Sequence, residues 1–181
     1  MAECFAVHAE LLQRWNARLN LTALSTPEQI LQRHFIESIF CAQRLCGDPA
    51  TLLDFGSGAG FPGIPIALCR PEIQVTLAES NGRKAAFLRE VVRTLSLKTV
   101  VYAGRVEAMP PGMLFDAVTM RAVDKMETAL NAAASRVNVG GRLALLTTLQ
   151  AAVSIPAGFA VESTLPLPNS ADRVLIQWQR R

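Results

Sequence analysis

Four glycines directly follow an apolar run in the stretch "LLDFGSGAGFPGIP", which covers residues 52–65. They form two overlapping patterns, Gly56-x-Gly58-x-Gly60 and Gly58-x-Gly60-x-x-Gly63. Glycine allows sharp turns and a close approach of the backbone to a ligand, because it has no side chain. Both patterns therefore predict a site for a nucleotide-like cofactor, but they imply different chemistry.

The second pattern is typical of dinucleotide-binding loops, in which the helix after the loop begins under the pyrophosphate. If Gly58 is the first glycine of that pattern, Pro62 and Pro65 fall where the helix should donate N–H groups, and proline has none. If Gly56 is the first glycine, the loop starts closer to the end of the strand, two residues after Asp54. This arrangement favours S-adenosylmethionine, which has no phosphate. A nicotinamide-dependent oxidoreductase is the alternative.

Polar residues that could complete such a site follow the other expected strands. Glu79 comes 23 residues after Gly56, where a carboxylate can accept hydrogen bonds from a ribose diol. Arg105-Val106-Glu107 follow the next strand, and Arg121 ends the strand after it. Ligands of open α/β sheets bind at the carboxyl ends of the strands. We therefore expect these residues to lie near the glycines.

The elements that must position these residues fall into two parts. Residues 1–48 are predicted to form a helical cap, with an amphipathic helix over 3–20 and a second helix from the N-cap Thr26 to about Gly47. From residue 49 onward strands alternate with helices, which is typical of a parallel α/β sheet. Two apolar segments joined by "PNSAD" predict an antiparallel hairpin at the C-terminal edge.

The expected core strands and helices follow one another closely. The strands are "TLLDF", "IQVTLAE", "KTVVYAG", "FDAVTMRA", "RLALLTTL", "FAVESTLPL" and "RVLIQWQ". The helices are "PIALCR", "NGRKAAFLREVVRTL" with Asn81 as its cap, and "KMETALNAAASRV". Gly140-Gly141 are expected to form the turn before "RLALLTTL". The prediction is one domain over 1–181, made of the cap and a core over 49–181 with a mostly parallel, seven-stranded sheet.

Composition limits the possible classes of protein. The chain has 181 residues, of which 50% are hydrophobic, enough for a sizeable core. No apolar run approaches the roughly 20 residues of a membrane span, and the first residues do not resemble a signal peptide, so a cytoplasmic protein is expected. The four cysteines form no C-x-x-C pair and there are two histidines. We therefore expect reduced thiols and no metal site.

The net charge is +3, but the basic residues are unevenly distributed. The segment 70–105 has seven basic and three acidic residues, a local net charge of +4. Such a segment can attract nucleic acid. It can also be a solvated helix face, and charge alone favours that interpretation over RNA binding.

The chain resembles the small-subunit (16S) ribosomal RNA guanine-N7 methyltransferases, also called glucose-inhibited division protein B. The matching segments are "RWNARLNLTAL", "RHFIESI", "LLDFGSGAGFPGIPIAL", "LAESNGRKAAFLREV", "RVEAMP" and "FDAVTMRAV". They occur in the family's order and spacing over almost the whole chain. The resemblance implies a class I S-adenosylmethionine-dependent methyltransferase fold, a Rossmann-like architecture, and a function in ribosomal RNA methylation.

The resemblance also implies a cofactor site on particular residues. Glu79 would hold the ribose, the backbone of Val106 and the side chain of Glu107 would lie near the adenine, and Arg121 would pair with the methionine carboxylate. Arg33 and His34 would belong to the cap over the pocket, on the side of the RNA substrate. The full set implied for the cofactor is Gly56, Ser57, Gly58, Gly60, Phe61, Glu79, Val106, Glu107 and Arg121.

The implied acceptor determines the mechanism that we expect. Guanine N7 has an exposed lone pair, so no general base is needed and catalysis rests on proximity and orientation. The expected partner is small-subunit ribosomal RNA or the ribosomal subunit, bound by a monomer. Thr147-Thr148 replace the family's Lys-Gly, Met120 replaces its serine, and the N-terminus is shorter than usual. These departures leave open a class I methyltransferase with another substrate, or a catalytically impaired RNA- or ribosome-binding homologue.

Overall fold

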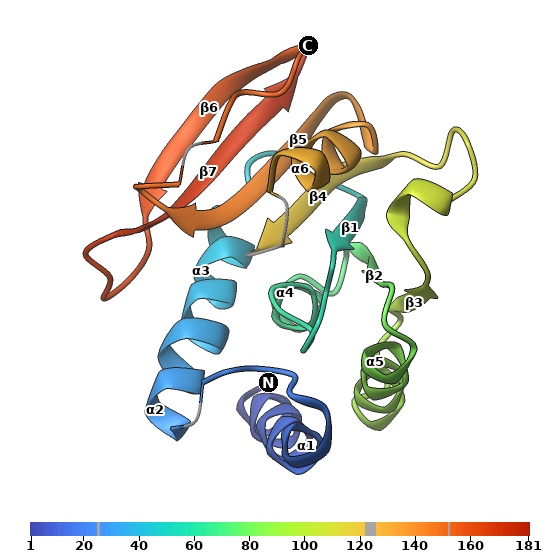
Figure 1. Cartoon of the computed structure of the whole chain (residues 1–181), viewed down its shortest axis with the longest axis vertical. Coiled ribbons are helices and arrows are strands. Elements are labelled where there is room, and N and C mark those ends of the chain that lie inside the picture. Colours follow the sequence, from blue (N-terminus) through green and yellow to red (C-terminus); the bar gives the residue numbers. More distant parts are fainter. Residues whose placement is uncertain (25, 122–125, 152) are drawn as a thin grey trace.

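The computed structural model describes residues 1–24, 26–121, 126–151 and 153–181 (Figure 1). The strands are β1 (Thr51–Phe55), β2 (Gln74–Glu79), β3 (Val100–Ala103), β4 (Phe115–Arg121), β5 (Val137–Thr148), β6 (Phe159–Pro166) and β7 (Arg173–Arg180). The helices are α1 (Ala2–Leu19), α2 (Pro27–Ile30), α3 (Glu37–Arg44), α4 (Gly63–Cys69), α5 (Gly82–Thr94) and α6 (Met126–Ala134). A π-helix, η1 (Leu31–Ile36), joins α2 to α3, and η2 (Val106–Ala108) is a short 3₁₀-helix.

The strands form one sheet in the order β3-β2-β1-β4-β5-β7-β6. The first five are parallel, whereas β7 runs antiparallel to both β5 and β6. The predicted mostly parallel, seven-stranded sheet with a C-terminal hairpin is therefore confirmed. The direction in which the chain adds strands reverses between β1 and β4, and ligands of open α/β sheets bind at such a point.

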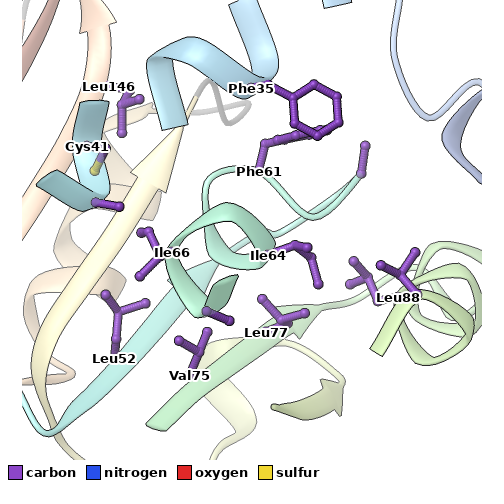
Figure 2. Packing of buried hydrophobic residues seen from close by; sticks show 14 of the residues in the cluster. Phe35, Cys41, Leu52, Phe61, Ile64, Ile66, Val75, Leu77, Leu88 and Leu146 are labelled. Carbon is purple, nitrogen blue, oxygen red and sulfur yellow. The ribbon is translucent and has the colours of Figure 1, made fainter. Parts of the chain in front are cut away.

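The central strands are apolar runs because helices cover both faces of the sheet. One buried cluster lies on the face covered by α4, α5 and the cap, and includes Leu52, Ile64 and Leu77. Figure 2 shows these side chains around α4, with Phe61 reaching toward Phe35 of the cap. A second cluster, on the other face, packs α6 against β4 and β5.

The cap is attached to the core at both of its ends. In α1, Trp15 packs edge-on against Phe87 of α5, with ring centroids 5.9 Å apart, and its Nε1 donates to Glu90 Oε2 at 3.0 Å. At the other end, the carboxylate of Glu37 accepts two hydrogen bonds from the Arg173 guanidinium, at 2.8 and 2.9 Å. Both partners of this ion pair are buried. Figure 1 shows α1 beside α5, and α3 between α4 and the C-terminal strands.

The two helix caps predicted from the sequence are confirmed. Thr26 Oγ1 accepts from the amide of Gln29 at 3.2 Å. Asn81 Oδ1 accepts from the amides of Arg83 and Lys84 at 3.0 and 3.2 Å. Each side chain satisfies helix-end donors that have no partner within the helix.

The turn predicted at Gly140-Gly141 is wrong, because both glycines lie inside β5. They accommodate an irregularity in the pairing with β4, where Phe115 pairs with Val137 but Ala117 pairs with Arg142. Gly140 has a φ of +79°, which glycine adopts without strain. A bulge of this kind depends on the partner strand, so local sequence alone predicts a turn.

The predicted strand end at Ala122 and helix start at Lys125 lie outside the described residues. All four cysteines are free thiols, of which Cys41 is buried and the other three are partly exposed. Within the described ranges, no helix is both long and apolar enough to cross a membrane.

Candidate cofactor site

The glycine-rich loop turns over the carboxyl end of β1. Gly56, Gly58 and Gly60 have φ values of +69°, +56° and +88°, a region that favours glycine because other residues are strained there. Gly63 is not in this conformation and is the first residue of α4. The three glycines with positive φ are those of the first pattern, which supports the S-adenosylmethionine interpretation of the loop.

The start of α4 has no amide to offer to a phosphate. The amide of Gly63 donates to Asp54 Oδ2 at 3.1 Å, and that of Ile64 donates to the Gly60 carbonyl at 2.8 Å. Pro65 has no N–H, and the first four residues of this helix are buried. A dinucleotide site uses such amides to bind the pyrophosphate. This geometry disfavours the nicotinamide alternative.

Asp54 holds the loop from beneath. Its side chain is 1% exposed, and in addition to the Gly63 amide it accepts from Thr119 Oγ1 at 3.0 Å. Burial raises the pKa of the Asp54 carboxyl to about 6, and the hydrogen bonds oppose that shift. Asp54 therefore connects β1, β4 and α4 and fixes the loop through buried contacts.

Glu79, the last residue of β2, is fixed beside the loop. Its Oε2 accepts from the amide of Gly58 at 3.0 Å, and its Oε1 accepts from the amide of Asn81 at 2.7 Å. A carboxylate has about four lone-pair sites, so each oxygen can accept a second hydrogen bond. The side chain is held in place while it keeps the capacity to bind a diol.

A pocket of about 180 Å³ opens at the carboxyl ends of β1, β2 and β3. Four residues that the sequence analysis expects at this edge, Gly56, Arg105, Val106 and Glu107, line it together. The remaining lining residues are Phe55, Ala78, Ser80, Gly104, Thr128 and Ala129. Ser80 and Gly104 directly follow strands, so position could have indicated them. Nothing in the local sequence marks Thr128 and Ala129, which lie on α6, as pocket residues.

Arg121 lies at the end of β4, and its two terminal guanidinium nitrogens differ in their hydrogen bonding. Its Nη2 donates to His34 Nδ1 at 2.7 Å. Its Nη1 is buried and has no hydrogen-bond partner among the described residues. Burial lowers the pKa of Arg121 to about 10, so the guanidinium is charged at neutral pH. A buried charged donor without a partner is rare in folded proteins and suits an anionic ligand group.

Phe61 lies between two histidines. Its ring stacks on His8 at a centroid distance of 4.8 Å and on His34 at 4.7 Å, with interplanar angles of 18° and 13°. Phe35 meets it edge-on at 4.9 Å, as Figure 2 shows. Both faces of the Phe61 ring are covered, so a cofactor could stack on the ring only by displacing one of the two histidines.

The remaining predicted residues differ in exposure. Arg33 is exposed on η1, whereas Ser57 is buried and its amide donates to the Ala78 carbonyl at 2.9 Å. Of the positions that depart from the family pattern, Met120 and Thr147 are buried and Thr148 is partly buried. Sequence reasoning missed Thr22, whose Oγ1 lies 2.7 Å from His34 Nε2. A single threonine in a loop has no sequence pattern that would predict such a contact.

Comparison with solved structures identifies the class of fold. The chain is similar to P. horikoshii TYW2, solved in complex with MeSAdo, with a TM-score of 0.66 and 15% identity over 86% of this chain and 64% of that one. It is also similar to the mitomycin 7-O-methyltransferase MmcR, with a TM-score of 0.64 and 19% identity over 80% and 53% of the two chains. Together with the sheet order, these similarities define a class I methyltransferase fold.

Sequence comparison identifies the family within that class. Residues 1–158 match the family described as GidB, rRNA small subunit methyltransferase G. The chain is 42% identical over 146 residues to ribosomal RNA small subunit methyltransferase G of Roseiflexus sp. (strain RS-1), covering 78% of this chain and 62% of the relative. It is 37% identical over 161 residues to the protein of that name from Xanthomonas euvesicatoria pv. vesicatoria (strain 85-10), covering 87% and 75%.

The chain therefore belongs to the rRNA small subunit methyltransferase G family. The alignment with the Roseiflexus relative spans less than two thirds of that relative's length.

Proposed function

We propose that this protein transfers a methyl group from S-adenosylmethionine to N7 of a guanine in small-subunit ribosomal RNA. Membership of the family over residues 1–158 carries the proposal. The resemblance to guanine-N7 methyltransferases supplies the target atom, and the conformation of the glycine-rich loop agrees with the cofactor.

The polar groups at the sheet edge fit the parts of this cofactor. Glu79 would accept hydrogen bonds from the ribose hydroxyls, and Arg121 would pair through its buried Nη1 with the methionine carboxylate. Val106 and Glu107 line the pocket and are assigned to the adenine. The loop of Gly56 and Gly58 allows close approach, since a Cβ built at Gly58 would meet only the Gly56 carbonyl, at 3.8 Å.

The reaction requires orientation and exclusion of water. When bound, S-adenosylmethionine would supply an electrophilic methyl group on a sulfonium. The lone pair of guanine N7 would form the new N–C bond while the methyl–sulfur bond breaks, and S-adenosylhomocysteine would leave with the electron pair of that bond. The chain must hold N7 and the methyl group in line, which supplies most of the rate. His34 is not available as a general base, because both of its ring nitrogens have hydrogen-bond partners and burial lowers its pKa to about 3. An unassisted nucleophile is consistent with this arrangement.

Exposed cations surround the same edge of the sheet. Arg33 on the cap, Arg83 at the start of α5 and Arg105 after β3 are all exposed and can neutralise RNA phosphates. We further propose that the protein acts in the cytoplasm as a monomer on the RNA or the ribosomal subunit. Among the described residues, no cluster of three or more His, Cys, Asp or Glu could hold a metal ion, and the proposed chemistry needs none.

Calorimetric titration tests the cofactor part of the proposal. We expect S-adenosylmethionine to bind with a micromolar dissociation constant, and NAD to give no heat under the same conditions. Binding of NAD alone would transfer the cofactor role to the Gly58-x-Gly60-x-x-Gly63 pattern and overturn the proposal.

A further inference from the structure

A chain of hydrogen bonds leads from Arg121 into the cap. A guanidinium only donates, so Nδ1 of His34 accepts from Arg121 Nη2 at 2.7 Å and carries no proton. The ring is then neutral with its proton on Nε2, which donates to Thr22 Oγ1 at 2.7 Å. The same hydroxyl oxygen also accepts from the amide of Leu24 at 3.1 Å. These contacts fix one tautomer of His34.

Thr22 is itself held by the first helix. Its amide donates to Asn16 Oδ1 of α1 at 2.9 Å. His34 lies on η1, and a π-helical turn inside a helix changes the direction of the side chains that follow it. The contact to Arg121 is therefore set by three separate parts of the cap, and none of them belongs to the sheet that carries the glycine-rich loop.

We infer that His34 is a positioning residue, which holds the Arg121 guanidinium so that Nη1 is left for the cofactor's carboxylate, with Thr22 fixing the tautomer. The inference rests on the proposed function. A free arginine side chain samples many rotamers and must be immobilised to form a directed, charge-assisted hydrogen bond. Binding to His34 immobilises it before the cofactor arrives. The cap thus forms part of the cofactor site although it contributes no residue to the glycine-rich loop.

His34 also stacks on Phe61, so an experiment must separate the acceptor from the ring. His34→Asn retains an acceptor near the position of Nδ1 and lacks the ring. His34→Phe retains the ring stack and lacks the acceptor. Each variant is titrated with S-adenosylmethionine and with 5′-methylthioadenosine, which lacks the amino-acid carboxylate.

We expect His34→Phe to bind S-adenosylmethionine about tenfold or more weakly, with methylthioadenosine binding unchanged. His34→Asn should stay within about threefold of the wild-type protein for both ligands. His8→Gln is the matched control: it removes the stack on the opposite face of Phe61 while keeping a donor for the Ala59 carbonyl. This control should bind both ligands as the wild-type protein does.

Three results would overturn the inference: His34→Phe binding like the wild-type protein, His34→Asn losing as much affinity as His34→Phe, or both ligands weakening equally. Wild-type protein that bound neither ligand would instead contradict the proposed function. If His34→Phe does not fold, ¹⁵N NMR of the histidine rings in the wild-type protein gives the answer. A proton on Nε2 of His34 is expected, and a proton on Nδ1 would overturn the inference.

Discussion

Arg121 is the single residue with the largest expected effect on cofactor binding. Arg121→Ala should weaken S-adenosylmethionine binding by more than about tenfold, since loss of a charge-assisted hydrogen bond costs on the order of 1.5–3 kcal/mol. Calorimetry measures the change directly. Arg89→Ala, at an exposed position on α5, is the matched control and should bind normally. Unchanged affinity in Arg121→Ala would remove this residue from the site.

The two histidines beside Phe61 make folding stability depend on pH. Burial lowers the pKa of His8 to about 4 and that of His34 to about 3, from an ordinary value of 6.5. The folding stability that the two neutral histidines contribute is fully present above pH 6.5. It is lost as the pH falls below that value, because these histidines bind protons more readily in the unfolded chain than in the folded protein. Each histidine contributes a slope of up to about 1.4 kcal/mol per pH unit.

The Asp54 carboxyl has the opposite effect on the pH dependence of folding stability. Its pKa is raised from 3.8 to about 6, so the folded state gains stability as the pH falls from 6 toward 3.8. The effects of the two histidines and of the aspartate partly cancel. Together these three groups lower the free energy of unfolding by about 1.4 kcal/mol per pH unit as the pH falls from roughly 6 to 4.5. Urea denaturation at several pH values measures this slope, and His8→Gln should flatten it. A slope that stayed unchanged in that variant would contradict the assignment to His8.

Several residues at the carboxyl edge of the sheet could be singled out from the sequence, because they are polar residues at the ends of apolar strands. Glu79 and Arg121 are examples, and both lie at the carboxyl edge of the sheet. Thr22 and Arg173 could not be predicted from local signals. Their partners, His34 and Glu37, lie 12 and 136 residues away in the sequence, and such contacts depend on tertiary packing.

At the scale of elements, α4 requires glycine at its first residue. A Cβ built at Gly63 would lie 2.3 Å from Leu77 Cδ2 and 2.6 Å from Asp54 Oδ2. Gly63→Ala should therefore lower the free energy of unfolding by about 1–3 kcal/mol through overpacking, as measured by chemical denaturation.

Gly82, the first residue of α5, is the matched control for that substitution. A Cβ built there meets no atom within 4 Å, so Gly82→Ala should be neutral or stabilise the protein by up to about 1 kcal/mol. If Gly63→Ala were as well tolerated as Gly82→Ala, the close contact of α4 with β1 and β2 would be wrong.

The ion pair between Glu37 and Arg173 joins the cap to the C-terminal hairpin. Arg173→Met leaves the Glu37 carboxylate, which is 1% exposed, without its partner and should cost about 3–5 kcal/mol. The double variant Glu37→Met/Arg173→Met removes both charges and should be more stable than the single variant. Thermal and urea unfolding of the single and double variants measure the coupling. A double variant less stable than the single variant would contradict this interpretation.

Element prediction succeeded where the signal is local. The caps at Thr26 and Asn81, and the apolar strands, depend on residues close together in the sequence. The π-helical turn at Leu31–Ile36 and the bulge near Gly140 were not predicted. The bulge arises from pairing between strands, and the π-helix has no established sequence signature.

At the scale of the whole molecule, the strand order explains why residues distant in the sequence lie at one edge of the sheet. Adjacent strands β2, β1 and β4 end in Glu79, the glycine-rich loop and Arg121 respectively. The reversal of direction between β1 and β4 leaves the crevice in which ligands of this architecture bind. The cap closes the same edge by holding Arg121 through His34.

The most direct test of the proposed function is transfer of a labelled methyl group. Purified protein is incubated with small-subunit ribosomal RNA or intact subunits and methyl-labelled S-adenosylmethionine, and the RNA is digested to nucleosides. We predict that the label is recovered in 7-methylguanosine and is strongly reduced with Arg121→Ala. Absence of label in the RNA, or label in another nucleoside, from protein that binds S-adenosylmethionine would contradict the proposed function.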